Sequence, residues 1–414
     1  VSYGASATIT GNSITGNAYT GIASGSDIFV DTQASGIILY GSTNVLIDNN
    51  TFAGNDMSIY VYGADTTIAD NIITMDNRQS VTNPVGLFGI VLDEGNTTVT
   101  NNTITGGLYG VLALAFADVT GDSVGTLDGN TISGASLAGI VLLDQDAGDA
   151  FMPILTSTRD ILKANATGLI VSSGAATVRT ADISDNTAFG IRVVGGTADV
   201  SLTRFYGNAM GIYATDTGSA VARDCWWNTN DGPGANVSGT VVVPDWLRIG
   251  LDGPASVPTG GSAAFTLTLK SAAGTPAPEG GWNLPVNFTA VGGIIVQTTD
   301  RVDASGRTAA TFTAGMPGPA EVRAIFDHVL IRRSLEIASP ITFTTQALDA
   351  AGNPVGVARE SREGQRIVLT GTLAAGTNWD AVTIDWGDNS PPDSAVLTTN
   401  ADGVAGCVEC LRCE

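Results

Sequence analysis

The stretch that decides the fold is NTITGGLYGV, residues 102–111. An Asn-Thr-Ile triplet leads into a Gly-rich turn, which is followed by Gly and a β-branched aliphatic residue. The arrangement returns as NTISGASLAGI at 130–140, and again at 12–22 and 50–59. Weaker copies are recognised by their second half, as in Gly168-Leu169, Gly190-Ile191 and Gly211-Ile212. Such internal similarity indicates a repeat architecture.

The spacing of the copies predicts a coil of three short strands per turn. Equivalent positions lie 21 or 22 residues apart, measured from Gly36 to Ser58, Gly89 to Gly110, Gly168 to Gly190 and Gly190 to Gly211. Longer intervals fit an insertion in a turn, and residues 79–84 look like part of one. About 21–22 residues suffice for three strands with their turns, since a strand advances ~3.3 Å per residue. Alternate Ile, Val and Leu side chains are expected to point inward and stack on those of neighbouring rungs.

Asparagines recur at one corner of this pattern, where we expect Asn to adopt left-handed backbone angles and its amide to bond the next rung. A β-sandwich is the alternative, because it also consists of short strands and Gly-rich turns. A sandwich, however, has no reason to repeat one triplet at a fixed interval. The repeat therefore favours a parallel β-helix.

Residues 1–247 resemble the right-handed parallel β-helix repeats of pectate-lyase-like and bacterial surface proteins. The resemblance includes the segment ARDCWWN at 222–228 with DGP at 231–233, which is similar to the Asn-Trp-Trp-Gly … Gly-Pro ending of surface β-helices. Cys225 and Asn228 stand where that ending has Asn and Gly. The resemblance implies the fold, but this fold hosts enzymes, adhesins and fibre proteins alike.

The rung pattern stops at 244–247, and residues 248–339 have the alternation and turn spacing of a β-sandwich. The segments PVNFT at 285–289 and GPAEV at 318–322 resemble the bacterial Ig-like domains of invasin-type adhesins. That resemblance implies a stalk spacer. The all-β prediction is thus a β-helix followed by Ig-like β-sandwich modules.

Residues 340–414 are expected to form a second Ig-like module. EGQRIVLTG at 363–371 and IDWGD at 384–388 resemble polycystic-kidney-disease-type (PKD) modules. Such modules continue with a His-x-Tyr stretch that this chain lacks, so we expect the module to be incomplete. Either the chain is truncated or another subunit supplies the missing strand. The chain also opens in mid-repeat, which indicates a processed or partial protein.

The charge excludes some functions. The formal net charge is −22, with 40 acidic residues against 18 basic ones. Such a surface repels phosphate backbones, which argues against nucleic-acid binding. It can attract divalent cations such as Ca²⁺, although no cofactor is expected. No run of about 18 apolar residues predicts a membrane span.

Glycoside hydrolysis needs two carboxylates across the scissile bond, and the repeat carries aspartates that are candidates for them. Asp70, Asp160, Asp182 and Asp224 occupy similar rung positions and could line one face. Asp also replaces Asn readily at a turn corner, and this structural interpretation is preferred. The pairs Lys163 with Asp160 and Arg192 with Asp182 have no supporting motif for lyase chemistry. The only histidine, His328, indicates no triad.

The remaining candidate site residues are cysteines and tryptophans. Cys407, Cys410 and Cys413 have metal-ligand spacing, but oxidation or linkage to another chain fits three thiols as well. Cys225 stands alone and is expected to be buried. Trp226, Trp227 and Trp246 could form a sugar-stacking platform, although a cap that shields the open end of the β-helix is preferred.

These observations predict a non-catalytic, extracellular or cell-surface protein in which a rigid β-helix carries Ig-like stalk modules. The first rung, at residues 8–12, shows no capping segment before it, so head-to-tail stacking of copies into a filament or surface layer is expected. The expected partners are copies of the chain or other cell-surface proteins. The alternatives are an adhesin that binds glycans through the β-helix, and a polysaccharide lyase or glycoside hydrolase.

Overall fold

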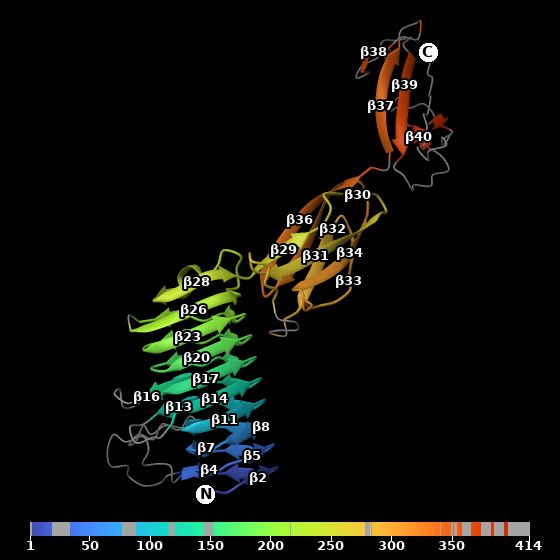
Figure 1. Cartoon of the computed structure of the whole chain (residues 1–414). Coiled ribbons are helices and arrows are strands. Elements are labelled where there is room, and N and C mark those ends of the chain that lie inside the picture. Colours follow the sequence, from blue (N-terminus) through green and yellow to red (C-terminus); the bar gives the residue numbers. More distant parts are fainter. Residues whose placement is uncertain are drawn as a thin grey trace.

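The computed structural model describes residues 2–18, 34–76, 88–115, 121–144, 152–215, 217–277, 282, 284–339, 341–348, 351, 354–357, 366–373, 382–384 and 393–395. The elements that lie wholly within these ranges are β-strands and one 3₁₀ turn, η2 (Gly234–Asn236). Figure 1 shows strands stacked into a solenoid, a smaller module at one end of the stack, and further strands beyond that module. The fold is therefore all-β, as predicted.

The solenoid consists of three parallel sheets that the chain visits in turn. Sheet A contains β1 (Ser2–Tyr3), β4 (Ser35–Tyr40), β7 (Met57–Tyr62), β10 (Phe88–Asp93), β13 (Tyr109–Ala115), β16 (Ala138–Asp144), β19 (Thr167–Val171), β22 (Phe189–Val193), β25 (Met210–Ala214) and β27 (Val237–Gly239). Sheet B contains β2 (Ala7–Thr10), β5 (Val45–Asp48), β8 (Thr66–Ala69), β11 (Gly95–Thr100), β14 (Ser123–Asp128), β17 (Pro153–Thr158), β20 (Ala175–Arg179), β23 (Gly196–Ser201), β26 (Gly218–Cys225) and β28 (Val241–Trp246). Sheet C contains β3 (Ser13–Thr15), β6 (Thr51–Ala53), β9 (Ile72–Thr74), β12 (Thr103–Thr105), β15 (Thr131–Ser133), β18 (Ile161–Lys163), β21 (Asp182–Ser184) and β24 (Arg204–Tyr206).

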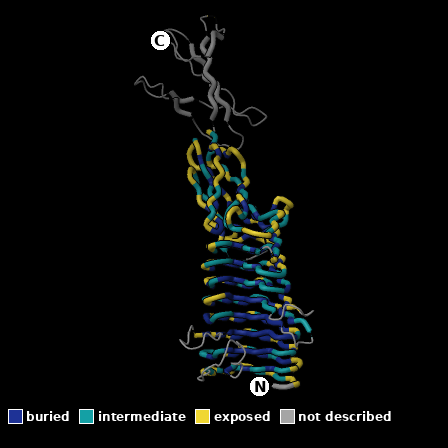
Figure 2. Tube along the Cα trace, turned by 90° about the vertical axis from the view of Figure 1, so that its left-hand side faces the viewer, coloured by how far each residue is buried: buried dark blue, intermediate teal, exposed yellow. Residues whose placement is uncertain are grey.

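The strand register confirms the repeat. Leu169 pairs with Ile191 and Ile191 with Ile212, at the predicted intervals of 22 and 21 residues. The inward column of sheet A is aliphatic in eight successive rungs: Ile37, Ile59, Ile90, Val111, Ile140, Leu169, Ile191 and Ile212. All eight are buried, and Figure 2 shows the buried residues running through the stack. Each rung thus buries its apolar face against its neighbours.

Glycine in the repeat has a steric reason. A Cβ placed on Gly168 would lie 2.5 Å from the carbonyl oxygen of Gly190, and one on Gly89 would lie 2.4 Å from that of Gly110. At these positions sheet A has no room for a side chain. The Gly-aliphatic pair therefore marks where the chain enters a strand of sheet A. The predicted insertion at residues 79–84 lies outside the described residues.

The module that follows has two sheets around one core. Sheet D has the order β29 (Arg248–Asp252), β31 (Ser262–Lys270), β34 (Arg307–Ala314) and β33 (Gly293–Gln297), and all its pairs are antiparallel. Sheet E has the order β30 (Ser256–Pro258), β36 (Val329–Ala338), β35 (Gly318–Phe326) and β32 (Val286–Val291). Phe265 and Phe312 from sheet D share a buried cluster with Val322 and Phe326 from sheet E. We call this unit the two-sheet module.

Beyond the module the described residues form two small antiparallel sheets. One has the order β38 (Pro354–Val357), β37 (Ile341–Leu348) and β39 (Arg366–Leu373), and the other pairs β40 (Val382–Ile384) with β41 (Asp393–Ala395). Residues 385–388, which carry part of the PKD-type resemblance, lie outside the described residues. No described helix is long and apolar enough to cross a membrane.

Candidate functional site

Sheet C is bordered on one side by a ladder of hydrogen-bonded side chains, which is exposed at Asn12 and buried from Asn50 onward. Asn12, Asn50, Asn71, Asn102, Asn130 and Asp160 succeed one another in this ladder. The Oδ1 atom of Asn102 accepts the backbone N–H of Asn71 at 2.9 Å, while Nδ2 of Asn102 donates to the carbonyl of Ile68 at 2.9 Å. One side chain therefore bonds a backbone donor and a backbone acceptor of the preceding rung, and buried backbone groups need such partners.

The left-handed corner is the residue before the ladder position, which corrects the sequence prediction. Asn49, Asp70 and Asn101 have φ of 53°, 52° and 54°, and each precedes a ladder asparagine. Arg159, Thr180 and Asp224 hold the same conformation in later rungs. Two tasks that the prediction gave to one Asn are thus divided between neighbours: one residue turns the chain, and the next one bonds the preceding rung.

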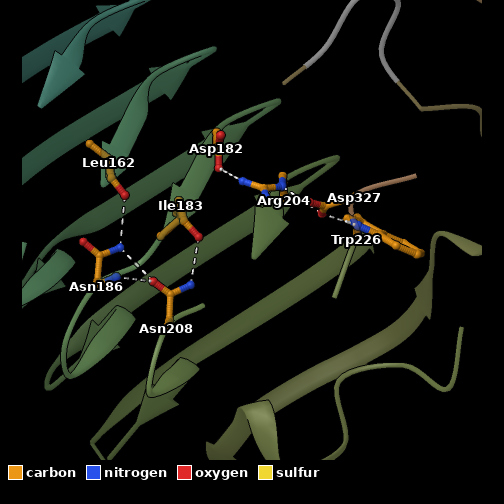
Figure 3. A network of polar contacts seen from close by, with 8 residues as sticks. All are labelled: Leu162, Asp182, Ile183, Asn186, Arg204, Asn208, Trp226 and Asp327. Atoms are coloured by element: carbon orange, nitrogen blue, oxygen red, sulfur yellow. Dashed lines mark hydrogen bonds and ion pairs between the residues drawn. The ribbon is translucent and has the colours of Figure 1, made fainter. Parts of the chain in front are cut away.

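A second ladder borders the other side of sheet C (Figure 3). Oδ1 of Asn208 accepts the backbone N–H of Asn186 at 3.1 Å, and its Nδ2 donates to the carbonyl of Ile183 at 2.8 Å. Asn186 makes the equivalent bonds: its Oδ1 accepts the backbone N–H of Asn165, and its Nδ2 donates to the carbonyl of Leu162, as Figure 3 shows. The same arrangement occurs in the first rungs, where Oδ1 of Asn55 accepts the backbone N–H of Asn17 at 3.1 Å and its Nδ2 donates to the carbonyl of Ile14 at 2.9 Å.

The first ladder ends in the carboxylate of Asp160. Oδ1 accepts the backbone N–H and Nδ2 of Asn130 at 2.7 and 2.9 Å, as an amide oxygen would. Oδ2 accepts the Ser157 hydroxyl at 2.6 Å, and Ser157 occupies an inward position between Leu127 and Val178. Burial raises the pKa of Asp160 to about 6, although the hydrogen bonds from Ser157 and Asn130 oppose this rise.

The four candidate aspartates do not line one face. Asp70 and Asp224 are turn corners, and Asp160 is fully buried in a ladder. Asp182 begins β21 and pairs with Arg204. The preferred interpretation, Asp at a turn corner, fits Asp70 and Asp224, whereas Asp160 and Asp182 occupy other positions of their rungs. Neither imagined lyase pair, Lys163 with Asp160 or Arg192 with Asp182, is an ion pair among those of the described residues.

The buried ion pairs gather where the solenoid meets the two-sheet module (Figure 3). Arg204, in the last strand of sheet C, donates from Nε to Oδ2 of Asp327 at 2.9 Å and from Nη2 to Oδ1 at 2.6 Å. Its Nη1 donates to Oδ1 of Asp182 at 2.7 Å. The indole Nε1 of Trp226 donates to Asp327 Oδ2 at 2.8 Å. We call these four residues the junction cluster.

The junction cluster is held by burial as well as charge. Burial raises the pKa of Asp182, although Arg204 opposes that rise. For Arg204 burial alone would lower the pKa, but Asp327 and Asp182 outweigh it and raise the pKa. The guanidinium also lies 4.6 Å from the centre of the Tyr206 ring, and that ring stacks on His328. A bidentate arginine supported in this way has little freedom to reorient.

The tryptophans lie around this junction. Trp226 is fully buried and contacts Phe326 of the module edge to face, with ring centres 5.6 Å apart. Trp227 is buried in the solenoid core, where it stacks on Phe205 at 4.6 Å. Trp246 is half-buried, and its Nε1 donates to the Asn230 carbonyl at 3.0 Å. Trp226 and Trp227 therefore expose no ring face on which a sugar could stack.

The cysteines divide into one described residue and three that are not. Cys225 is buried, and burial raises the pKa of its thiol to about 12, so it is protonated at neutral pH. Cys407, Cys410 and Cys413 lie outside the described residues. Among the residues that the structure describes, no three His, Cys, Asp or Glu side chains are grouped so as to hold a metal ion.

Sequence reasoning missed a second apolar cluster, on the outer face of sheet A. Its buried members are Met57, Tyr60, Phe88, Val91, Leu112, Leu114, Ala138 and Val141. The Tyr60 hydroxyl donates to Oδ2 of Asp93 at 2.7 Å. The sequence does indicate this cluster, because VLALA at 111–115 is a continuous apolar run. Such runs are typical of strands that are buried on both faces. On the same face, in rungs closer to the two-sheet module, the rings of Phe189 and Tyr213 stack with their centres 5.4 Å apart. Both side chains are half-exposed.

Comparison with known proteins identifies the fold. The sequence profile of the family described as right handed beta helix region matches residues 1–120 and 115–243. No curated protein matches the chain. Domains 4 and 5 of the S-layer protein SbsC match at 17% identity and a TM-score of 0.19, over 24% of this chain and 56% of that one. The chain thus spans little more than half of that structure.

Two enzymes also appear among the matched structures. A mutant of the periplasmic alginate epimerase AlgG matches at 13% identity and a TM-score of 0.29, over 50% of this chain and 70% of that one. The enzymatically active domain of tailspike protein 2 from bacteriophage CBA120 matches at 7% identity and a TM-score of 0.32. The match covers 91% of this chain and 66% of that one. At these values none of the likenesses bears on function.

Proposed function

This chain belongs to the right-handed β-helix family, and we propose that it is a non-catalytic structural part of an extracellular or cell-surface protein. In this proposal the β-helix and the two-sheet module form one rigid body that holds whatever lies beyond it at a fixed distance and direction. Copies of the chain or other cell-surface proteins are its partners.

The observation that carries the proposal is the junction cluster. Arg204 of the last sheet C strand makes a bidentate pair with Asp327 of the module, and Trp226 donates to the same carboxylate. Trp226 also belongs to the module's apolar core together with Leu247 and Ile249. A contact that unites a buried ion pair and a shared core resists bending, whereas a flexible linker would leave the two parts independent.

The domain assignments predicted from the sequence for residues 248–414 are part of this proposal. Residues 248–339 are taken as an Ig-like spacer and residues 340–414 as an incomplete PKD-like Ig module. Two sheets around one core support the first assignment. The boundary near residue 247 is supported by the chain passing from β28 of sheet B to β29 of sheet D at that point.

The positions of the carboxylates support a structural role over an enzymatic one. Asp160 is buried in a ladder, and Asp182 is paired with Arg204. Asp70 and Asp224 serve the chain reversal. Glycoside hydrolysis requires two carboxyl groups that flank the same glycosidic bond. Each of these residues is instead explained by the fold.

Electron microscopy of single particles tests the proposal through the angle between the β-helix and the two-sheet module. We expect one narrow angle for the wild type and for Arg223→Met, which breaks an exposed ion pair with Asp199. Arg204→Met should broaden the angle. If that variant fails to fold, Asp327→Asn is the substitute, because it removes the charge and keeps the side-chain shape. It should broaden the angle as well. A broad angle in the wild type would refute the rigid body.

A second candidate function, glycan binding by an adhesin, is favoured by the stacked pair Phe189 and Tyr213. These half-exposed rings lie beside Arg192 on the outer face of sheet A. Aromatic faces next to a cation suit an acidic sugar. A glycan array probed with the full chain and with Tyr213→Ala decides the matter: binding that the substitution abolishes supports the adhesin, and absence of binding excludes it for the glycans tested.

A further inference from the structure

Among the described residues the two-sheet module has four edge strands, and three of them are protected. In sheet D, β29 carries the charged residues Arg248 and Asp252. In sheet E, β30 ends with Pro258, which has no N–H to donate. The outward N–H groups of Val286 and Phe288 on β32 donate to the Asp300 carbonyl at 2.7 Å and the Gln297 side chain at 3.2 Å. Such devices prevent an edge from pairing with another strand.

The fourth edge, β33, has none of these devices. Its sequence is GIIVQ, and residues 292–299 contain no charged side chain and no proline. Ile294 is 70% exposed and Val296 is 62% exposed, which are high values for aliphatic residues on a strand. An exposed, apolar and uncharged edge strand is a template for pairing with another chain.

The backbone of β33 is oriented for such pairing. The Gly292 carbonyl accepts the N–H of Gly315, just past β34, and the N–H of Thr298 donates to Ala309 of β34, so the even-numbered positions face that strand. In an antiparallel ladder the odd-numbered positions then direct N–H and C=O away from it. Among the described residues no strand lies beyond β33 in sheet D. The backbone groups of Gly293, Ile295 and Gln297 therefore point away from β34, while the Gln297 side chain donates to the Val286 carbonyl of β32.

We propose that β33 pairs antiparallel with β33 of a second copy of this chain, around a two-fold axis at Ile295. Ile295 then exchanges both backbone hydrogen bonds with the partner's Ile295. Ile294 lies opposite the partner's Val296 in a pair without hydrogen bonds, where side chains are closest. The two exposed aliphatic residues of each copy cover those of the other, and sheet D continues across both molecules.

Charge favours a second copy at this edge. The chain carries a formal charge of −22, so most of its surface repels another copy. Along β33 two copies approach through a neutral segment and bring no like charges opposite each other. This inference deepens the proposed function and rests on it for the choice of partner, because it names the surface through which copies of a structural protein meet side by side.

Disulfide trapping tests the register. In a background with Cys407→Ser, Cys410→Ser and Cys413→Ser, one full-length sample carries Ile294→Cys and another Val296→Cys. Side chains opposite each other in such a pair are close enough for a disulfide. We expect an equimolar mixture to form disulfide-linked dimers, and each sample alone to form few. Equal cross-linking in all three samples, or none in the mixture, would overturn the pairing.

Sedimentation velocity over a concentration series tests the affinity with the native cysteines present. Val296→Lys should weaken dimerisation about tenfold or more, because two lysines then face apolar partners. Ile72→Lys is the matched control, since Ile72 is 54% exposed on the inner strand β9 of sheet C. A wild type that stays monomeric, or a dimer that Val296→Lys leaves intact, refutes this inference. The angle measured by microscopy is independent of that outcome, so the rigid-body proposal can stand or fall separately.

Discussion

In the β-helix each buried side chain packs on its equivalents in the rungs above and below, whereas in the two-sheet module each buried side chain packs on a different neighbour. The β-helix buries polar amides in two ladders beside aliphatic columns such as Ile104 and Ile132. The module core depends on large unique contacts such as Phe265 with Phe312. Repetition allows a buried polar group to be satisfied by the same group one rung away, and a core without repetition lacks that option.

The two regions meet at the junction cluster, and the largest effect is expected there. Arg204→Met leaves Asp182 and Asp327 buried without their cation, which costs about 3–5 kcal/mol. Calorimetry should show the two-sheet module melting separately from the β-helix in this variant. The exposed pair of Arg223 with Asp199 contributes at most about 1 kcal/mol, so Arg223→Met should melt as the wild type does. Equal effects of the two substitutions would contradict the account.

A ladder substitution tests whether repetition stabilises the β-helix. Asn102→Ala leaves the N–H of Asn71 and the carbonyl of Ile68 buried without the side-chain partner, and we expect a loss of about 3 kcal/mol. Asn96→Ala is the control, since Asn96 is exposed and bonds only Asp65 through its side chain. Unfolding in guanidinium gives both values. A loss below about 1 kcal/mol for Asn102→Ala would show that the amide ladder is dispensable.

Asp160, at the end of the first ladder, gives the ladder a contribution to stability that depends on pH. Burial raises the pKa of Asp160 from 3.8 to about 6, so its contribution to stability is fully present below pH 3.8 and is lost as pH rises through about 6. Asp160→Asn removes this loss and restores an amide. It should stabilise the protein at pH 7.5 by up to about 3 kcal/mol, and by much less at pH 4.5. A stabilisation independent of pH would contradict a buried carboxyl group.

A glycine substitution gives the smallest expected effect within the repeat. Gly168→Ala forces a Cβ toward the Gly190 carbonyl 2.5 Å away, and rungs must separate to admit it. We expect a loss of about 1–3 kcal/mol, measured by thermal unfolding. Gly16→Ala is the control for space, since no atom lies within 4 Å of an added Cβ, although its φ of 75° strains Ala as well. An unchanged midpoint for Gly168→Ala would question the close packing of sheet A.

Much of the fold could be predicted from the sequence because the β-helix depends on a short sequence pattern that recurs in successive rungs. Gly190-Ile191 and Gly211-Ile212 mark equivalent positions, and the register joins them as expected. The candidate site could not be predicted in this way. Arg204 and Asp327 are 123 positions apart, and no pattern links them. Among the aspartates a shift of one residue separates a turn corner from a ladder position, so residue type alone did not separate their roles.

The most direct test of the rigid body measures one distance across the junction. Spin labels are attached at Thr98→Cys on β11 and Ile325→Cys on β35, in the background with Cys407, Cys410 and Cys413 replaced by Ser. Double electron–electron resonance then gives the distribution of label distances. The account predicts one narrow distribution for this chain and a broad one after Arg204→Met. A broad distribution with Arg204 in place would show that the β-helix and the two-sheet module move independently.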